Sequence, residues 1–267
     1  MIKASFVLPV KNGSKFIANT LKSLLKQTEK NIEIIVVNDN STDNTDDIVK
    51  RIAREDSRIK LFHNPVNLTG EAATRNFGTK HTKGKIILPT DADDPNNFTR
   101  AEISYNELRK NKADIFYGTL EHYYTETGKR EKRFFQPYDA ELLKYINYIN
   151  HAGASAYLKS AFIKLGGYDT KINIGTDYDM WLRAQKIGLK FIGRDIILAQ
   201  YTIHRNQMTA TTIKNRHYWL RTIRKKHTIY NIDIKYVKKN ARKEVVDFFI
   251  NNPYYYKIWF NKNSIPD

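Results

Sequence analysis

The chain of 267 residues carries 45 Lys and Arg against 28 Asp and Glu, a formal net charge of +17 that favours anionic partners such as phosphates, nucleic acid or acidic lipid. Hydrophobic residues make up 41% of the sequence, enough for one large domain or one domain with an appendage, and the absence of cysteine excludes disulfides and thiolate metal sites. No apolar run is long enough for a signal peptide or a membrane span, so we expect a cytoplasmic protein or one attached to a membrane surface.

Two patterns alternate along the first part of the chain. Short apolar runs predict buried strands, and apolar residues spaced by three or four positions predict helices. In chain order these are strand 6–10, helix 17–27, strand 32–37, a helix ending near residue 53, strand 59–62, helix 70–80 and strand 86–88. The alternation predicts an α/β fold with a mostly parallel central sheet flanked by helices, and ligands at the carboxyl ends of its strands.

The second part of the chain is less regular. It predicts a helix over 177–188 and strands over 113–117, 121–124, 130–135, 154–158 and 196–203. No linker or repeat appears before about residue 212, so we expect one domain over 1–212 and a C-terminal extension over 213–267.

The extension is basic and rich in aromatic residues. From residue 214 onward it holds 13 Lys and Arg against 4 Asp and Glu, with Tyr, Trp and Phe between them. Such a segment suits the headgroup region of an anionic membrane. The equally weighted alternative is a pair of amphipathic helices packed back on the domain, with their charges in solvent.

The densest cluster of acidic residues is the run Asp91-Ala92-Asp93-Asp94, directly after the predicted strand 86–88. Like charges at this spacing repel one another, and a divalent cation with oxygen ligands would offset them. A cation with open coordination positions also holds a diphosphate, which favours a nucleotide-linked substrate. The alternative is an Asp-rich turn after a strand.

Six motifs occur in a fixed order along the chain: Val-Leu-Pro-Val-Lys-Asn-Gly at 7–13, Ile-Val-Val-Asn-Asp-Asn-Ser-Thr-Asp at 35–43, Gly-Glu-Ala-Ala-Thr-Arg-Asn at 70–76, Asp-Ala-Asp-Asp-Pro at 91–95, Gly-Gly-Tyr-Asp at 166–169 and Thr-Asp-Tyr-Asp-Met-Trp-Leu-Arg at 176–183. In this order they resemble the family 2 glycosyltransferases, which have the GT-A fold. The resemblance covers roughly residues 3–210. It implies inverting transfer of a sugar from a nucleoside diphosphate donor to an acceptor hydroxyl.

The resemblance assigns residues to the donor. Asp39 ends the second predicted strand and would accept the N3 hydrogen of a uracil ring, which implies a UDP-sugar. Pro9, Val10 and Asn12 would line the nucleoside pocket, although ordinary turn chemistry also explains Asn12. Arg75 would reach the base or the diphosphate as a fixed cation, unless it is a surface residue.

The resemblance also implies a metal site built on an Asp-x-Asp pair. Asp93 would contact Mn²⁺ or Mg²⁺ directly, and Asp91 would bind the ribose, or the metal through water. His204 would help to coordinate the metal or a phosphate, whereas Asp94 would only structure the turn. His151 would approach the acceptor or the diphosphate, although a lone His is more often a structural residue.

Asp177 is the candidate general base, because inversion needs a carboxylate opposite the leaving group and near the acceptor hydroxyl. The family usually has Glu before this Asp, and this chain has Thr176 instead. Asp179 points to another side of the same predicted helix and suits the helix dipole. Trp181 is either an acceptor platform or, more simply, a buried aromatic residue.

Together these features predict transfer of a hexose or N-acetylhexosamine from a UDP-sugar to a glycan or lipid-linked acceptor. The expected setting is bacterial cell-surface polysaccharide synthesis, in the cytoplasm or on the inner face of the cytoplasmic membrane. The alternatives are a nucleotidyltransferase-like enzyme, a non-catalytic protein that binds a nucleotide sugar and, less favoured, a basic nucleic-acid-binding protein. The single Gly in the loop 9–14 weighs against the first, and the clustered carboxylates weigh against the last.

Overall fold

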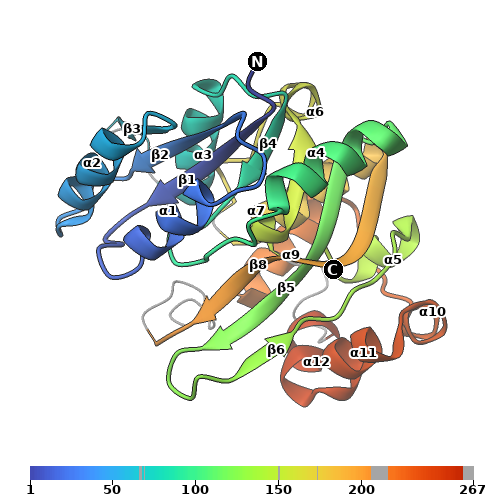
Figure 1. The fold of residues 1–267 in the computed structure, drawn as a ribbon. Coiled ribbons are helices and arrows are strands. Elements are labelled where there is room, and N and C mark those ends of the chain that lie inside the picture. Colours follow the sequence, from blue (N-terminus) through green and yellow to red (C-terminus); the bar gives the residue numbers. More distant parts are fainter. Residues whose placement is uncertain (66–67, 69, 150, 173, 206–215, 261–267) are drawn as a thin grey trace.

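The computed structural model describes residues 1–260 except 66–67, 69, 150, 173 and 206–215 (Figure 1). Within this part of the chain one mixed sheet has the strand order β3-β2-β1-β4-β7-β5-β6, and β8 pairs with β5. The strands are β1 (Ala4–Val10), β2 (Ile32–Asn38), β3 (Ile59–His63), β4 (Ile86–Pro89), β5 (Ile115–Tyr124), β6 (Arg130–Lys132), β7 (Ser155–Leu158) and β8 (Phe191–Ile203).

The first four strands confirm the predicted parallel half of the sheet. β1 pairs in parallel with β2 and with β4, and β2 pairs in parallel with β3. The second half is mixed, because β7 is antiparallel to both β4 and β5. The two strands predicted over 113–117 and 121–124 are one strand, β5, whose pairing with β8 shifts register between Tyr117 and Leu120.

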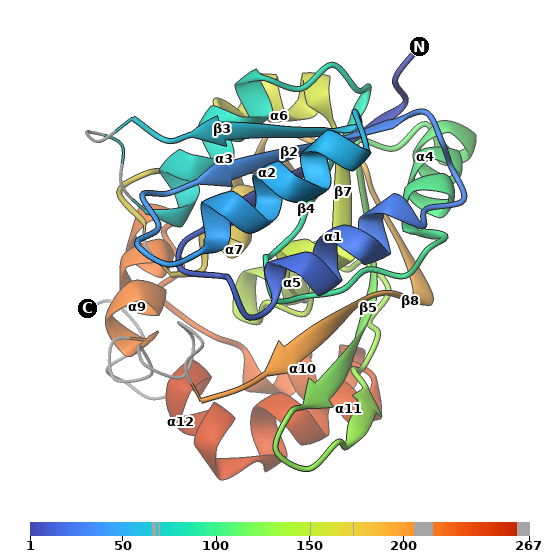
Figure 2. The same cartoon turned by 60° about the vertical axis from the view of Figure 1, so that its left-hand side comes forward.

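Helices cover both faces of the sheet (Figures 1 and 2). Pattern reasoning missed α4 and α5. The helices before the extension are α1 (Ile17–Leu25), α2 (Thr45–Glu55), α3 (Glu71–Lys80), α4 (Arg100–Asn111), α5 (Ala140–Tyr145), the 3₁₀ turn η1 (Ala152–Ala154), α6 (Lys159–Leu165) and α7 (Thr176–Lys186).

The alternation of side chains along the strands separates two cores. On β1, Phe6 and Leu8 face the apolar sides of α1, α2 and α4, whereas Val7 faces the core that holds α3, α6 and α7. α3 approaches the sheet closely at Gly78, where a Cβ atom would lie 2.8 Å from the side chains of both Val7 and Val37. Any larger residue there would push α3 away from the strand ends.

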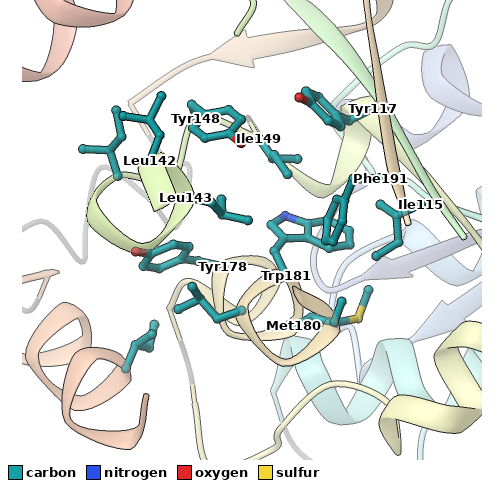
Figure 3. Close-up of a cluster of buried hydrophobic side chains, with 14 of the residues drawn as sticks. Ile115, Tyr117, Leu142, Leu143, Tyr148, Ile149, Tyr178, Met180, Trp181 and Phe191 are labelled. Carbon is teal, nitrogen blue, oxygen red and sulfur yellow. The ribbon is translucent and has the colours of Figure 1, made fainter. Parts of the chain in front are cut away.

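Trp181 is the centre of the second core (Figure 3). Its side chain is fully buried, with its ring centroid 6.3 Å from those of Tyr157 and Phe191. Leu143 and Met180 lie around it in the same view. Trp181 is therefore a core residue, and the hypothesis of an acceptor platform is wrong.

The extension packs on this core, and its later helices lie at one end of the molecule beside β6 (Figure 1). It consists of α9 (Arg216–Lys226), α10 (Ile234–Asn240), α11 (Lys243–Val246), the π-helix η3 (Asp247–Asn251) and α12 (Pro253–Phe260). The buried apolar residues that it contributes are Leu220, Ile223, Ile229, Val237, Val245, Phe249, Ile250, Ile258 and Phe260.

The packing is the second of the two arrangements expected for the extension. Its helices fold back on the domain, while Tyr218, Tyr230, Tyr254 and Tyr256 stay exposed. The expected boundary at residues 212 and 213 falls outside the described residues. Within the described part of the chain, every helix is too short or too polar to span a bilayer.

Candidate active site

A cleft of about 720 Å³ opens at the carboxyl ends of β1, β2 and β4. We call it the acidic cleft. Seven residues predicted for donor or metal binding line it, namely Pro9, Val10, Asn12, Asp39, Asp91, Asp93 and His204. It forms because parallel strands end at the same edge of the sheet, so loops distant in sequence meet there.

The loops after β1 and β2 form one wall of the acidic cleft. The backbone N–H of Asp39 donates to the carbonyl of Val10 (2.8 Å), and its carboxylate accepts from the Asn64 amide (2.9 Å). Asn12 has a left-handed φ of 52°, and its side-chain oxygen accepts from the backbone N–H of Thr42 (2.8 Å). These bonds fix the loop that would meet a nucleoside.

Asp43 strengthens the same wall. Its carboxylate accepts the backbone N–H groups of Ser14 and Thr45, each at 3.1 Å. Burial opposes ionisation of Asp43, but these hydrogen bonds outweigh it and lower its pKa to about 2. The N-cap residue of α2 is Asn44. An ionised Asp43 thus joins the first two loops.

Asp91 lies between two cationic side chains. One of its oxygens binds Arg75, and the other lies 2.8 Å from Nε2 of His151. Burial alone would raise the pKa of Asp91, but the charge of Arg75, followed by that of His151, holds it well below its usual range. Asp91 is therefore ionised.

Arg75 is only 1% exposed, so the alternative of a surface Arg is wrong. Its Nε donates to Glu71 at 2.8 Å, one turn earlier on α3. Its Nη1 is buried and has no hydrogen-bond partner among the described residues. Arg75 does not line the acidic cleft but supports Asp91 from behind.

Asp93 forms a second acid–imidazole pair. Its carboxylate lies 3.0 Å from Nε2 of His204, whose ring stacks on Phe16 at a centroid distance of 4.6 Å. Burial, and then the charge of Asp91, raise the pKa of Asp93, while His204 opposes the shift. The pair places His204, which follows β8, against residues 91–94, which we call the acidic loop.

Asp94 does more than structure the turn. It is 2% exposed, and burial raises its pKa well above the ordinary value. The backbone N–H of Thr202 donates to it at 2.7 Å, which joins the acidic loop to β8. Ligand atoms of Asp91, Asp94 and His151 all lie within 4.8 Å of one another.

This set of two carboxylates and one imidazole suits a hard divalent cation such as Mn²⁺ or Mg²⁺. Asp93 and His204 stand beside it as further donors. After burial, the negative charges of neighbouring Asp residues also raise the pKa of Asp93 and Asp94, and a bound cation would offset this repulsion. The residues present therefore fit the expected metal.

His151, which sequence reasoning placed near the acceptor or diphosphate, is the centre of the cluster. Its φ of 34° is left-handed, and the backbone N–H of Gly153 donates to its Nδ1 at 3.0 Å. Burial would lower the pKa of His151, but Asp91, and then Asp94 and Asp177, raise it to about 10. Nε2 of His151 faces Asp91 and therefore carries a proton that it shares with this carboxylate.

Asp177 is the second residue of α7, and its carboxylate accepts from the backbone N–H of Tyr178 at 2.8 Å. Burial raises its pKa, and the charge of His151 opposes that shift. The negative charge of Glu71 also raises the pKa of Asp177, and the positive charge of Arg75 lowers it. The charges of Asp177 and His151 thus act on one another, although Asp177 does not line the acidic cleft.

Arg100 is a supporting residue that sequence reasoning missed. It is fully buried on α4, and its Nη2 donates to the carbonyls of Pro89 and Ser155, each at 2.8 Å. Its Nη1 donates to Thr90 and Asn96. Burial lowers its pKa to about 9, so it is still a cation at neutral pH. It thereby fixes the start of the acidic loop.

Comparison with known proteins agrees with this geometry. Residues 5–166, more than half of the chain, match the glycosyl transferase family 2. The chain belongs to this family. It is therefore a glycosyltransferase, as the six motifs indicated, and the nucleotidyltransferase and nucleic-acid-binding alternatives lose their support.

Relatives in the family match over different lengths. An uncharacterized glycosyltransferase of Methanocaldococcus jannaschii is 28% identical over 92% of this chain and 81% of its own. The UDP-Glc:alpha-D-GlcNAc-diphosphoundecaprenol beta-1,3-glucosyltransferase WfaP of Escherichia coli is 29% identical over 86% of this chain and 87% of its own length. The glycosyltransferase GlyG of Streptococcus pneumoniae is 34% identical over 46% of this chain, which spans only 41% of that protein.

Solved structures share the fold. The chain is similar to Staphylococcus aureus TarS in complex with UDP-GlcNAc, with a TM-score of 0.69, 19% identity and coverage of 89% of this chain and 69% of that one. It is also similar to the mannosyltransferase PcManGT from Pyrobaculum calidifontis in complex with GDP-Man and Mn²⁺, with a TM-score of 0.69 and 17% identity. This similarity covers 96% of this chain and 72% of the other. These similarities confirm the α/β fold with a parallel sheet core and flanking helices.

Proposed function

We propose that this glycosyltransferase transfers a hexose or N-acetylhexosamine from a UDP-sugar to a hydroxyl of a glycan or lipid-linked acceptor, with inversion and with Mn²⁺ or Mg²⁺ bound. The observation that carries the proposal is the meeting of carboxylates from three distant segments at one edge of the sheet. Asp39 lies in the wall after β2, Asp91 to Asp94 follow β4, and Asp177 at the start of α7 lies near enough for its charge and that of His151 to shift each other's pKa.

We expect the donor to bind in the acidic cleft. Asp39, with Pro9, Val10 and Asn12 beside it, would bind the nucleoside, and the carboxylate would accept the N3 hydrogen of uracil. Support for UDP comes from the name of the E. coli relative and from the TarS complex, whereas the archaeal structure holds GDP-Man. UDP and GDP are therefore the two donors to compare.

Asp177 would take the proton of the acceptor hydroxyl. The hydroxyl oxygen forms its bond to the anomeric carbon from the face opposite the diphosphate, and the bond from that carbon to the diphosphate oxygen breaks, with its electron pair leaving on UDP. The raised pKa of Asp177 makes it a stronger base than an exposed carboxylate. Thr176 in place of the usual Glu removes a neighbouring charge, which affects acceptor contacts rather than this proton transfer.

Asp91, Asp94 and His151, with Asp93 and His204 beside them, would hold the divalent cation. When bound, the cation supplies positive charge to the diphosphate leaving group. The proposed setting is assembly of a bacterial cell-surface polysaccharide at the inner face of the cytoplasmic membrane, supported by the E. coli relative that acts on a diphosphoundecaprenol-linked sugar.

The variant Asp177→Asn tests the assignment of the base. It keeps the size of the side chain but cannot accept the proton, so we expect transfer to fall by about 10²–10⁴-fold. Binding of the nucleotide should stay unchanged, because Asp177 does not line the acidic cleft. Transfer is measured as UDP released in the presence of acceptor.

A thermal-shift screen supplies the control for this variant and tests the donor. UDP, GDP and their sugar conjugates are compared with and without Mn²⁺, because a bound ligand stabilises the folded state according to its concentration over its dissociation constant. We expect UDP with Mn²⁺ to stabilise the wild type and Asp177→Asn equally. Stabilisation by GDP alone would contradict the role of Asp39, and appreciable turnover in Asp177→Asn would refute the base.

A further inference from the structure

A second cleft, of about 830 Å³, lies beside the acidic cleft. Strands β5 and β8 form one wall, the segment from β6 to Phe135 forms another, and the extension closes it. We call it the extension cleft. The residues that line it are His122, Tyr124, Glu131, Lys132, Arg133, Phe134, Phe135, Asp195, Tyr201, Ile203, His204, Arg242, Glu244, Phe248, Asn252, Tyr254 and Tyr255.

The two clefts are neighbours that share part of their lining. Tyr201 and His204 line both of them. His204 lies 3.0 Å from Asp93, and the ring of Tyr201 lies 5.1 Å from that of His151. One end of a molecule in the extension cleft would therefore lie beside the residues that hold the acidic loop.

One wall of the extension cleft holds a cation between aromatic rings. The guanidinium of Arg133 lies 3.4 Å from the centroid of the Phe248 ring and 4.3 Å from that of Phe134. The Tyr255 ring continues this stack at 3.8 Å from Phe248. Burial lowers the pKa of Arg133 to about 10, which leaves it charged at neutral pH. The stack fixes the position of this charge.

A second Arg supports the same wall. The guanidinium of Arg242 lies 5.4 Å from the Phe135 ring, and its backbone N–H donates to the Gln136 side chain at 2.8 Å. Lys132 also lines the cleft and forms an ion pair with Asp195 at 2.7 Å. Arg guanidinium groups bind phosphate oxygens in bidentate fashion, and aromatic rings offer flat apolar surface to a sugar ring.

We propose that the extension cleft binds the acceptor, and that this acceptor is a sugar joined to a phosphate or diphosphate. Arg133 and Arg242 hold the phosphate, the aromatic rings pack on the sugar, and the free hydroxyl points past Tyr201 toward His151 and Asp177. The inference rests on the proposed function, because it assigns the second substrate of the same reaction. It also gives the extension a role as one wall of the site.

Equilibrium binding in the absence of any donor tests the proposal. The probes are N-acetylglucosamine with an alkyl diphosphate at C1, N-acetylglucosamine 1-phosphate and the neutral methyl glycoside. The variants are Arg133→Met, Arg242→Met and Tyr255→Ala. Arg130→Met is the matched control, because Arg130 lies on the same hairpin but pairs with Glu121 and does not line the cleft. Stabilisation of each variant by UDP with Mn²⁺ checks that it is folded.

We expect the alkyl diphosphate probe to bind the wild type and Arg130→Met equally, and each Arg variant about tenfold or more weakly. Tyr255→Ala should weaken the sugar probes without changing stabilisation by UDP. Tighter binding of the diphosphate than of the 1-phosphate would identify a lipid-type diphosphate linkage, and equal binding would identify the phosphate alone; either supports the cleft.

Unchanged binding of the alkyl diphosphate probe to both Arg variants would overturn the proposal. The proposal would also fail if the neutral methyl glycoside bound as tightly as the charged probes. The outcome is separate from that of the proposed function. If the wild type failed to bind UDP but bound the probe in a way that depends on Arg133 and Arg242, the donor would be refuted and the cleft kept. Binding of UDP without binding of the probe would keep the donor and refute the cleft.

Discussion

At the scale of single residues, the acidic loop depends on buried cations that hold its carboxylates in place. Arg75 supports Asp91 from behind, and Arg100 binds the backbone where β4 ends. A buried guanidinium is costly to desolvate, so it persists where several acceptors surround it. Sequence reasoning identified Arg75 through its motif. It missed Arg100 because a lone Arg in a helix has no distinguishing pattern.

Replacing Arg100 by Met should destabilise the fold and weaken nucleotide binding together. The change leaves the carbonyls of Pro89 and Ser155 without their buried donor, which costs about 2–4 kcal/mol of unfolding free energy. Urea unfolding measures the loss, and Mn²⁺-dependent stabilisation by UDP measures the effect on the loop. Arg109→Met on the exposed side of α4 is the control, and an Arg100→Met protein as stable as this control would contradict the role.

At the scale of elements, α9 of the extension holds the helix that carries the candidate base. Asp179 on α7 is fully buried and binds Lys226 at 2.6 Å, His227 at 2.9 Å and Arg183 at 2.8 Å. Sequence reasoning treated Asp179 as a charge that suits the helix dipole. Its main partners come instead from a helix nearly fifty residues later, and this contact lies two residues from Asp177.

The variant Asp179→Asn should lose this link. Burial would raise the pKa of Asp179, but His227, Lys226 and Arg183 lower it well below its ordinary value. A depressed folded pKa gives stability that is present above the unfolded pKa, about 3.9, and is lost as pH falls toward the folded value. We therefore expect Asp179→Asn to cost about 2–4 kcal/mol at pH 7 and less below pH 4.

Urea unfolding of both proteins at pH 7, 4 and 3 measures this difference. Lys225→Met, an exposed change next to Lys226, is the control for the loss of a positive charge on α9. A gap in unfolding free energy between wild type and Asp179→Asn that does not shrink on acidification would show that the carboxylate charge is not the stabilising feature.

At the scale of the whole molecule, the extension is part of the fold and also carries more than half of the net positive charge of the sequence. Burying a Leu, Ile or Phe side chain is worth about 1.5–3 kcal/mol, and the extension buries several against the second core. Its removal would therefore unfold the protein rather than isolate a membrane contact. The hypothesis that it touches an anionic membrane has to be tested on the full chain.

Flotation with vesicles of neutral lipid alone or with added anionic phospholipid provides that test. Lys238 and Lys239 are exposed on α10, and each Lys near an anionic surface contributes about 1 kcal/mol. We expect the full chain to float with anionic vesicles at low salt, and the double change to Glu to abolish flotation. The same double change at Lys110 and Lys112, on and after α4, is the control. Equal flotation of both variants would end the membrane hypothesis.

The sequence by itself determined the elements of the parallel half and the identity of the acidic cleft. Apolar runs fixed β1, β2 and β4 because their side chains are buried on both faces, and the family resemblance pointed to seven residues that line the cleft. These signals are local, so a single stretch of residues is enough to read them.

Only the tertiary structure decided which partners those residues meet. His151 and Asp94 join Asp91 because a left-handed turn and the end of β8 reach the same strand edge, and Asp179 meets α9 because the extension folds back. Side-chain pairs between distant segments depend on the packing of whole helices and strands. No periodicity or spacing within one segment records that packing, which is why the extension cleft was not predicted.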